Sequence, residues 1–320
     1  MAGEVLFVAT APGLLIKMTI GFWGDRVSYN SRIAIICLSS IMSFYLASEF
    51  DSVWIRLVGI GLCSIAKNLG EATFLALTAH YGNRTIGMWS SGTGAAGIAG
   101  AGLYVLLTDL IGISNRNTLR ICGPTALIIA WAYGVVLTTS ESSSESSLVP
   151  LSKGNQYGFT PARQQLFLVM MRVFIMPLMF VYYAEYTINQ GILPTLDQFH
   201  GREKSSVLYA RYQLVYQVGV FVSRSSLHWV QVPVSRLGLF PILQLLNLGI
   251  LMLQAILHWT DRVFVIYLLI FWEGLVGGGA YVNSFYQVSQ TTGDGEREWA
   301  LSIASVGDSI GILFAAVTDT

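Results

Sequence analysis

Six charged side chains lie inside long apolar runs of the sequence, where a charge is costly. At the centre of a membrane helix a charged residue costs about 2.5–3.5 kcal/mol on insertion scales, and it usually faces a cavity or a partner. These residues are Lys17, Lys67, Glu71, Glu185, Glu273 and Asp308. Their types and positions indicate a protein that handles a polar substrate or a proton inside a membrane.

Glu273 stands in the stretch FWEGLVGGGAYVNSFYQVS and is followed by a glycine triplet that includes Gly277 and Gly278. At helical spacing its face is small and polar, while the opposite face is bulky. Small residues let helices pack closely or leave room for a ligand. We expect Glu273 to face the bundle interior and to bind a proton or a cationic part of a substrate. The alternative is tight helix packing with Glu273 hydrogen-bonded to a neighbour.

The other candidates for substrate or proton binding fall in two groups and one single residue. Glu185 lies in VYYAEYTINQG, where Tyr182 and Asn189 share its helical face and have groups that can hydrogen-bond a carboxylate. That face favours a cavity wall. Lys67 and Glu71 are four residues apart, so they share a helix face. They either neutralise each other as a structural pair or take part in substrate or proton binding, and the sequence leaves both possibilities open. Asp308 is the remaining candidate.

Long apolar runs must position these residues. The chain is 53% hydrophobic and 11% charged, whereas soluble domains carry about 25% charged residues. A run of about 20 apolar residues crosses a bilayer as a helix, so we predict an all-α polytopic membrane protein with about ten spans. They are Glu4–Phe22, Ile33–Ser48, Val53–Ala79, Gly87–Leu107, Leu119–Thr138, Leu166–Gly191, Tyr209–Leu227, Leu237–His258, Val263–Val288 and Trp299–Val317.

The spans divide into five, a hydrophilic loop and five. The pattern predicts an N-terminal bundle over residues 1–139, a cytoplasmic linker over 140–165 and a C-terminal bundle over 166–320. Many secondary transporters consist of two such halves with the substrate site near the midplane between them. We place Asn83 of the sequon Asn83-Arg84-Thr85 in the cytoplasm and expect it to carry no glycan.

Several other classes of function find no support in the sequence. The net charge is zero, which gives no reason to propose a nucleic acid as partner. Cys37, Cys63 and Cys122 lie inside apolar runs without a metal or redox spacing. No nucleophile elbow or phosphate-binding loop is present. We therefore expect no cofactor, no metal and no enzyme activity.

The loop after the first span, GFWGDRVSYNSR, resembles the loop signature of the major facilitator superfamily through Gly21, Asp25, Arg26 and Arg32. In that superfamily the signature lies between helices two and three. The resemblance implies that the first span is helix two and that the first helix is missing from this chain. Lys67 and Glu71 then fall on helix four, Glu185 on helix seven and Glu273 on helix ten. Together with helix one, these are the helices that line the cavity in such transporters.

Two further patterns concern packing and internal symmetry. Gly92, Ala96 and Gly100 recur every fourth residue, which predicts a packing seam against another helix. Gly219, Arg224 and Arg236 form a weak second copy of the loop signature. For that copy we favour ordinary cytoplasmic positive residues.

Longer motifs carry a more specific resemblance. MWSSGTGAAG, VYYAEYTINQG, RYQLVYQVGVFVSRSSL, FWEGLVGGGAYVNSF and EREWALSIASVGDSIG together resemble the battenin (Batten-disease protein, fungal BTN) family over nearly the whole chain. The resemblance implies a major-facilitator-like multi-pass protein of the lysosomal or vacuolar membrane. It also implies a link to lysosomal or vacuolar pH, to basic amino-acid levels and to the clearance of glycerophosphodiesters.

Two functions of different class follow as expectations. The first is a transporter of a small polar or charged metabolite, of the basic amino-acid or glycerophosphodiester class, working with or without protons. The second is a non-transporting membrane organiser that affects pH and trafficking through protein partners. Pairing of all the buried carboxylates with basic residues, together with the absence of a cavity, would favour the second. The substrate, the coupling ion and the direction stay open in the sequence.

Overall fold

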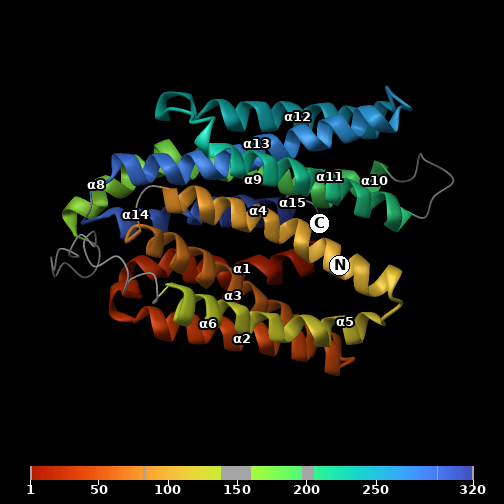
Figure 1. The fold of residues 1–320 in the computed structure, drawn as a ribbon. Helices are drawn as coiled ribbons and strands as arrows, with labels where there is room; N and C mark the ends of the chain where they lie inside the picture. The colour runs from red at the N-terminus through yellow and green to blue at the C-terminus, as the bar shows by residue number, and fades with distance from the viewer. Residues whose placement is uncertain (1, 82–83, 138–159, 197–204, 294, 319–320) are drawn as a thin grey trace.

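A computed structural model describes residues 2–81, 84–137, 160–196, 205–293 and 295–318 (Figure 1). Within these ranges the regular elements are helices. Nine of the described helical segments are long and apolar enough to cross a membrane, by length and composition. The chain is thus an all-α polytopic membrane protein, as predicted.

The first half contains the helices between Ala2 and Leu137. They are α1 (Ala2–Trp23), η1 (Gly24–Arg26), α2 (Tyr29–Glu49), α3 (Val53–Thr78), α4 (Arg84–Val105), η2 (Leu106–Leu110), α5 (Asn115–Cys122), η3 (Gly123–Ala126), α6 (Leu127–Trp131) and η4 (Ala132–Leu137). Side-chain caps fix two of the starts. Ser28 accepts a hydrogen bond from the Ser31 amide at the start of α2, and Ser114 accepts one from the Asn117 amide at the start of α5.

The second half begins at Pro161, where Thr160 accepts a hydrogen bond from the Arg163 amide and proline occupies the first helical position. Its elements are α8 (Pro161–Met170), η5 (Met171–Ile175), α9 (Met176–Tyr186), η6 (Thr187–Ile192), α10 (Leu193–Leu196), α11 (Ser205–Ser225), η8 (Ser226–His228), η9 (Val234–Arg236), α12 (Leu239–Leu257), α13 (Val263–Thr291), α14 (Arg297–Ala304) and α15 (Val306–Thr318). The helices α8, α9 and α10 follow one another as one continuous helical segment. The single π-helical turns η5 and η6 join them.

The seventh predicted span differs from the rest. The structure forms it as the helix α11, but α11 is absent from the nine described segments that meet the criteria for a membrane span. Polar residues such as Gln213, Gln217 and Arg224 are spread along it. These polar side chains indicate that α11 contacts polar groups inside the protein, and the candidate site described below contains such groups.

The helices form two bundles that repeat the same contacts (Figure 1). In the first, α1 and α2 pack on α3; in the second, α11 and α12 pack on α13. Between the bundles, α15 packs on α1 and α4 packs on α11, while α14 contacts α3 and α4 contacts α13. This reciprocity matches α1 with α11, α2 with α12, α3 with α13 and α4 with α14–α15. It agrees with the expected numbering, in which the first span occupies the position of helix two.

Apolar clusters hold each bundle and also join the two. One cluster lies inside the first bundle around Ile20, Ile36 and Leu69. Another lies inside the second around Ile188 and Tyr212. The largest cluster contains residues of both bundles. In it, Leu75 and Ile86 of the first bundle join Tyr281, Phe285, Trp299 and their neighbours of the second.

Polar contacts close the bundles at the end where α8 and α14 begin, which is the predicted cytoplasmic end (Figure 1). The Tyr29 hydroxyl of α2 donates to Glu298 Oε1 of α14 at 2.5 Å. His80, just beyond α3, lies with Nε2 3.5 Å from Glu298 Oε2. Arg163 Nε donates to Glu296 Oε2 at 2.6 Å and joins α8 to the start of α14. The start of α1 and the end of α15 lie near each other, away from this end.

Much of the predicted linker between the two bundles lies outside the described residues. Residues 140–159 of the predicted linker and Asn83 of the sequon lie outside the described residues. The last residues of the predicted linker are helical, because α8 begins at Pro161. The linker's cytoplasmic position and the absence of a glycan at Asn83 stay predictions.

The predicted packing seam on α4 is wrong. A Cβ at Gly92 or Gly100 would meet nothing within 4 Å in the described structure, and Ala96 is exposed. Gly94 and Gly97 make the approach instead, because a Cβ there would lie 3.0 Å from Phe221 Cα and 2.0 Å from Gln217 Oε1 of α11. Glycines occur on more than one face of α4, so spacing alone could not select the packed face.

The loop signature folds as a turn against the helices that it joins. Arg32 is buried, donates to the carbonyls of Gly24 and Val27, and stacks over the Tyr29 ring at 4.7 Å. A Cβ at Gly21 would lie 2.7 Å from Ile303 Cδ1 of α14, so glycine permits that approach. Arg26 is exposed. The side chain of Asp25 lies outside the described part of the structure.

Candidate functional site

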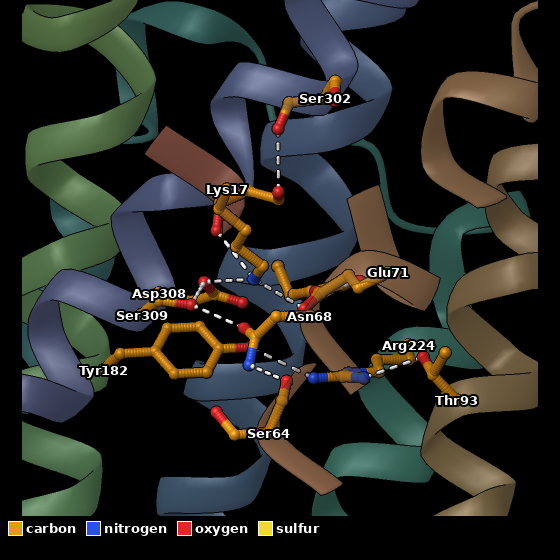
Figure 2. A network of polar contacts seen from close by, with 12 residues as sticks. Lys17, Ser64, Asn68, Glu71, Thr93, Tyr182, Arg224, Ser302, Asp308 and Ser309 are labelled. Atoms are coloured by element: carbon orange, nitrogen blue, oxygen red, sulfur yellow. Dashed lines mark hydrogen bonds and ion pairs between the residues drawn. The ribbon is translucent and has the colours of Figure 1, made fainter. Parts of the chain in front are cut away.

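Lys17 lies at the contact between the bundles and joins three helices (Figure 2). Its Nζ donates to Glu71 Oε2 of α3 at 2.7 Å, to Asp308 Oδ1 of α15 at 2.8 Å and to the Ser305 carbonyl at 2.9 Å. An ammonium group has three N–H donors, so these bonds use all of them. The Lys17 side chain is 0% exposed. We call Lys17, Glu71 and Asp308 the Lys17 cluster.

Neutral polar groups complete the Lys17 cluster (Figure 2). The Tyr281 hydroxyl of α13 donates to Glu71 Oε1 at 2.7 Å. Ser309 Oγ lies 2.9 Å from Asp308 Oδ1 and 3.0 Å from Asn68 Oδ1 of α3. Each carboxylate therefore meets both the Lys17 cation and a hydroxyl. Buried charges with this degree of pairing are tolerated because attraction offsets the loss of hydration.

Of the two possibilities left open for Lys67 and Glu71, direct pairing of the two is not what the structure shows. Lys67 shares a helix with Glu71 but makes no ion pair with it in the described structure, and its side chain is exposed. Lys17, 54 residues earlier in the sequence, neutralises Glu71 instead. Spacing within one helix shows which residues share a face, but it carries no information about a cation from a neighbouring helix.

Glu185 and Glu273 meet in a second buried cluster, inside the C-terminal bundle. Glu185 of α9 accepts a short hydrogen bond from the Tyr216 hydroxyl of α11. Glu273 Oε1 of α13 accepts from Asn189 Nδ2 at 2.8 Å, and the same amide nitrogen lies 3.0 Å from the Glu185 carbonyl oxygen. We call Glu185 and Glu273 the carboxyl pair.

The local backbone explains how the two side chains of the carboxyl pair come together. Asn189 lies in the π turn η6, one turn after Glu185; such turns are frequent at functional sites. Gln213 of α11 donates to Asn189 Oδ1 at 2.8 Å and so orients its amide toward Glu273. A Cβ at Gly277 would lie 1.9 Å from Glu185 Oε2, so this glycine makes the space that the carboxylate occupies.

The carboxyl pair lacks the compensation that the Lys17 cluster has. Glu185 is 3% exposed and Glu273 is 0% exposed. The Oε2 atoms of both residues are buried and accept no hydrogen bond, and neither carboxylate has a basic residue at ion-pair distance among the described residues. An uncompensated buried carboxylate costs several kcal/mol. A bound proton or cation removes that cost.

Two neighbours of Glu185 have partners that the sequence did not predict. We expected Tyr182 and Asn189 to hydrogen-bond its carboxylate, but Tyr182 accepts from Arg224 Nη2 at 3.1 Å and Asn189 holds Glu273. Tyr216 takes the expected role from another helix. A shared face within one helix did not identify these bonds because the structure forms them across helices.

Sequence reasoning missed several residues of the site. Lys17 was counted among the charges of the spans but not among the candidates, and Arg224 was taken for a loop residue. Arg224 lies in the last turn of α11, between the bundles. The signal that could have marked both is a basic residue inside a predicted span. Tyr216, Gln213 and Tyr281 carry no comparable signal.

Comparison with known sequences agrees with these features. The model of the CLN3 protein family matches residues 1–163 and 159–320. Protein BTN1 of Kluyveromyces lactis is 36% identical over 323 residues, which cover 98% of this chain and 82% of that protein. Battenin of Canis lupus familiaris is 35% identical over 325 residues, which cover 96% of this chain and 73% of that protein.

Solved structures show the fold. The nucleoside transporter NupG aligns with a TM-score of 0.54 and 15% identity over 99% of this chain and 80% of that chain. The E. coli fucose:proton symporter FucP aligns with a TM-score of 0.52 and 13% identity over 99% of this chain and 87% of that chain. The architecture is therefore the two-bundle fold of major facilitator transporters. By the family model and by these relatives, the chain belongs to the CLN3 protein family, and it is similar along nearly its whole length to battenin and BTN1 proteins.

Proposed function

We propose that this protein transports a small polar or charged metabolite across a membrane, with the carboxyl pair as the site that binds a proton or a cationic group. The observation that carries the proposal is the uncompensated state of the pair. Glu185 Oε2 and Glu273 Oε2 are buried without a hydrogen bond, and neither carboxylate forms an ion pair among the described residues. In the Lys17 cluster the carboxylates are neutralised by a basic side chain, whereas Glu185 and Glu273 form no such ion pair in the described structure.

Positions along the helices also support a transport role. Glu185 and Glu273 lie on α9 and α13, which correspond to helices seven and ten of the expected numbering. Membrane transporters place coupling carboxylates inside the bundle, where a proton or a cation changes the balance of charge. The carboxyl pair has two acceptor atoms available for such a ligand.

The substrate class and the membrane in this proposal rest on the family resemblance. We infer a basic amino acid or a glycerophosphodiester as cargo, a lysosomal or vacuolar membrane as location, and a contribution to the pH of that compartment. The relatives named above as battenin and BTN1 motivate this part of the proposal. No cofactor and no enzymatic step enters it.

The alternative is a membrane organiser that does not transport. The Lys17 cluster favours it, because there the buried carboxylates are paired with a cation and hydroxyls, as a purely structural network would be. The carboxyl pair favours transport. A protein in which Glu185 and Glu273 could be replaced without any effect on solute movement would fit the organiser.

Counterflow in proteoliposomes tests the proposal. The purified chain is reconstituted and uptake of radiolabelled L-arginine and of sn-glycero-3-phosphocholine is measured across a series of external pH values. We expect uptake of at least one of them. We expect Glu273→Gln, which keeps the shape and the Asn189 contact, to remove the dependence of uptake on pH.

The control is Asp261→Asn, which removes a carboxylate from an exposed position just before α13. It should leave uptake and its pH profile unchanged. An unaltered pH profile in Glu273→Gln would assign Glu273 to packing and move the coupling role to Glu185. Absence of uptake of both solutes by the unmodified chain would favour the organiser.

A further inference from the structure

We propose that Arg224 is a binding site for the anionic group, a carboxylate or a phosphodiester, of the transported solute. The inference rests on the proposed function and deepens it, because it adds a cationic binding site to the carboxyl pair in the same protein. Arg224 lies where α4, α9, α11 and α13 meet (Figure 2).

The guanidinium of Arg224 is held by neutral groups. Its Nη1 donates to Thr93 Oγ1 of α4 at 2.8 Å, and its Nη2 donates to the Tyr182 hydroxyl of α9 at 3.1 Å. Its Cζ lies 4.0 Å from the centre of the Tyr281 ring of α13. These contacts fix the plane of the guanidinium without neutralising its charge.

Arg224 has unused donors and no carboxylate partner. Arginine has five N–H donors, and the bonds to Thr93 and Tyr182 use two. Its Nε–H is buried without an acceptor, and no ion pair forms at this residue in the part of the chain that the structure describes. A half-buried guanidinium with open donors attracts an oxyanion, which its planar fork binds through two parallel hydrogen bonds.

The surroundings make Arg224 and the carboxyl pair complementary. Tyr182, which contacts Arg224, stands one helical turn before Glu185 on α9, and Tyr216, which contacts Glu185, lies on α11 with Arg224. A positive and a negative site therefore lie on the same two helices, about one helical turn apart along α9. A solute with one anionic group and one cationic group fits this arrangement, because each charge meets its opposite.

A pairwise binding experiment isolates the anionic group. The purified full chain in lipid nanodiscs is titrated with L-arginine and with agmatine, which lacks the carboxylate, and with sn-glycero-3-phosphocholine and with choline, which lacks the phosphodiester. Equilibrium binding of the radiolabelled probes is measured, and the ligand-dependent rise of the unfolding midpoint is recorded beside it.

We expect the unmodified chain to bind the anionic member of at least one pair about tenfold or more tightly than its anion-free partner. Arg224→Gln should reduce the affinity for that anionic member by about tenfold or more, since a charge-assisted hydrogen bond is lost. It should leave the affinity for the anion-free partner unchanged. The pair that shows the Arg224-dependent preference identifies the carboxylate or the phosphodiester as the recognised group.

The matched control is Arg236→Gln, an exposed arginine of the following loop, and it should bind all probes as the unmodified chain does. If Arg224→Gln fails to fold, Arg224→Lys replaces it in the test, because lysine keeps the positive charge but lacks the planar fork of the guanidinium. A reduced preference of Arg224→Lys for the anionic probe over its anion-free partner would then support the site. An undiminished preference in the folded variant overturns the inference and leaves the proposed function standing. Equal binding of both members of each pair by the unmodified chain also overturns it. Binding of none of the probes overturns the proposed substrate class and this inference together.

Discussion

The two buried clusters differ in how their charge is balanced. In the Lys17 cluster one ammonium meets two carboxylates and a carbonyl, and its donors are all used. In the carboxyl pair two carboxylates meet two hydrogen-bond donors, and each keeps one buried oxygen without a partner. The Lys17 cluster also joins the bundles, whereas the carboxyl pair lies within the second one. Stability is therefore expected to depend on the first, and ligand binding on the second.

Loss of Lys17 should have the largest effect. Lys17→Met leaves Glu71 and Asp308 buried without their cation, so we expect the free energy of unfolding to fall by about 3–5 kcal/mol. Reversible unfolding in lipid nanodiscs measures it. Adding Glu71→Gln and Asp308→Asn to Lys17→Met removes the uncompensated charges and should recover most of the loss. A loss of less than about 1 kcal/mol in the unfolding free energy of the single variant would contradict the assigned structural role.

Gly277 should have an intermediate effect. A Cβ at this position would lie 1.9 Å from Glu185 Oε2, so Gly277→Ala must displace the carboxylate, and overpacking of this kind costs about 1–3 kcal/mol. Gly92→Ala is the matched control, because nothing lies within 4 Å of its Cβ in the described structure. It should raise stability by up to about 1 kcal/mol through helix propensity. Equal effects at the two glycines would contradict the packing described here.

Glu273 should have the smallest effect on stability. Glu273→Gln removes an uncompensated carboxylate but keeps an oxygen for Asn189, so we expect the unfolding free energy to change by less than about 1 kcal/mol. Asp308→Asn, which weakens a paired carboxylate, should cost more in the same assay. If Glu273→Gln proved as destabilising as Lys17→Met, the difference between the clusters would disappear.

Much of the fold could be predicted from the sequence, because long apolar runs dictate membrane helices whatever their neighbours are. The runs from Val53 and from Val263 begin at the residues where α3 and α13 begin. The partners inside the site could not be predicted in the same way. Lys17 pairs with Asp308, 291 residues later, and neither residue's position along its helix specifies which helix lies opposite.

The carboxylates themselves were found because a charge in an apolar run is rare. Glu185 and Glu273 were both selected on that ground, and the structure brings them together through Asn189 and Gly277. Tyr216 was missed because a tyrosine in an amphipathic helix is unremarkable until its hydroxyl has a buried acceptor. The spacing of residues along the sequence identified which of them share a helix face. The contacts between residues of different helices became clear only from the packing of those helices.

The π turn η6 also determines how this segment can vary in length. A π turn holds one residue more than an α turn, and one residue corresponds to about 100° of rotation about the helix axis. Deleting a single residue between Thr187 and Ile192 would let the segment continue as a regular α-helix. Leu193 and Leu196 would then keep their cluster with Tyr212 and Leu251, and Glu185 upstream would keep its direction, because the π turn already accommodates the extra residue. The extra residue instead changes the direction of the side chains inside the turn, among them Asn189, which donates to Glu273.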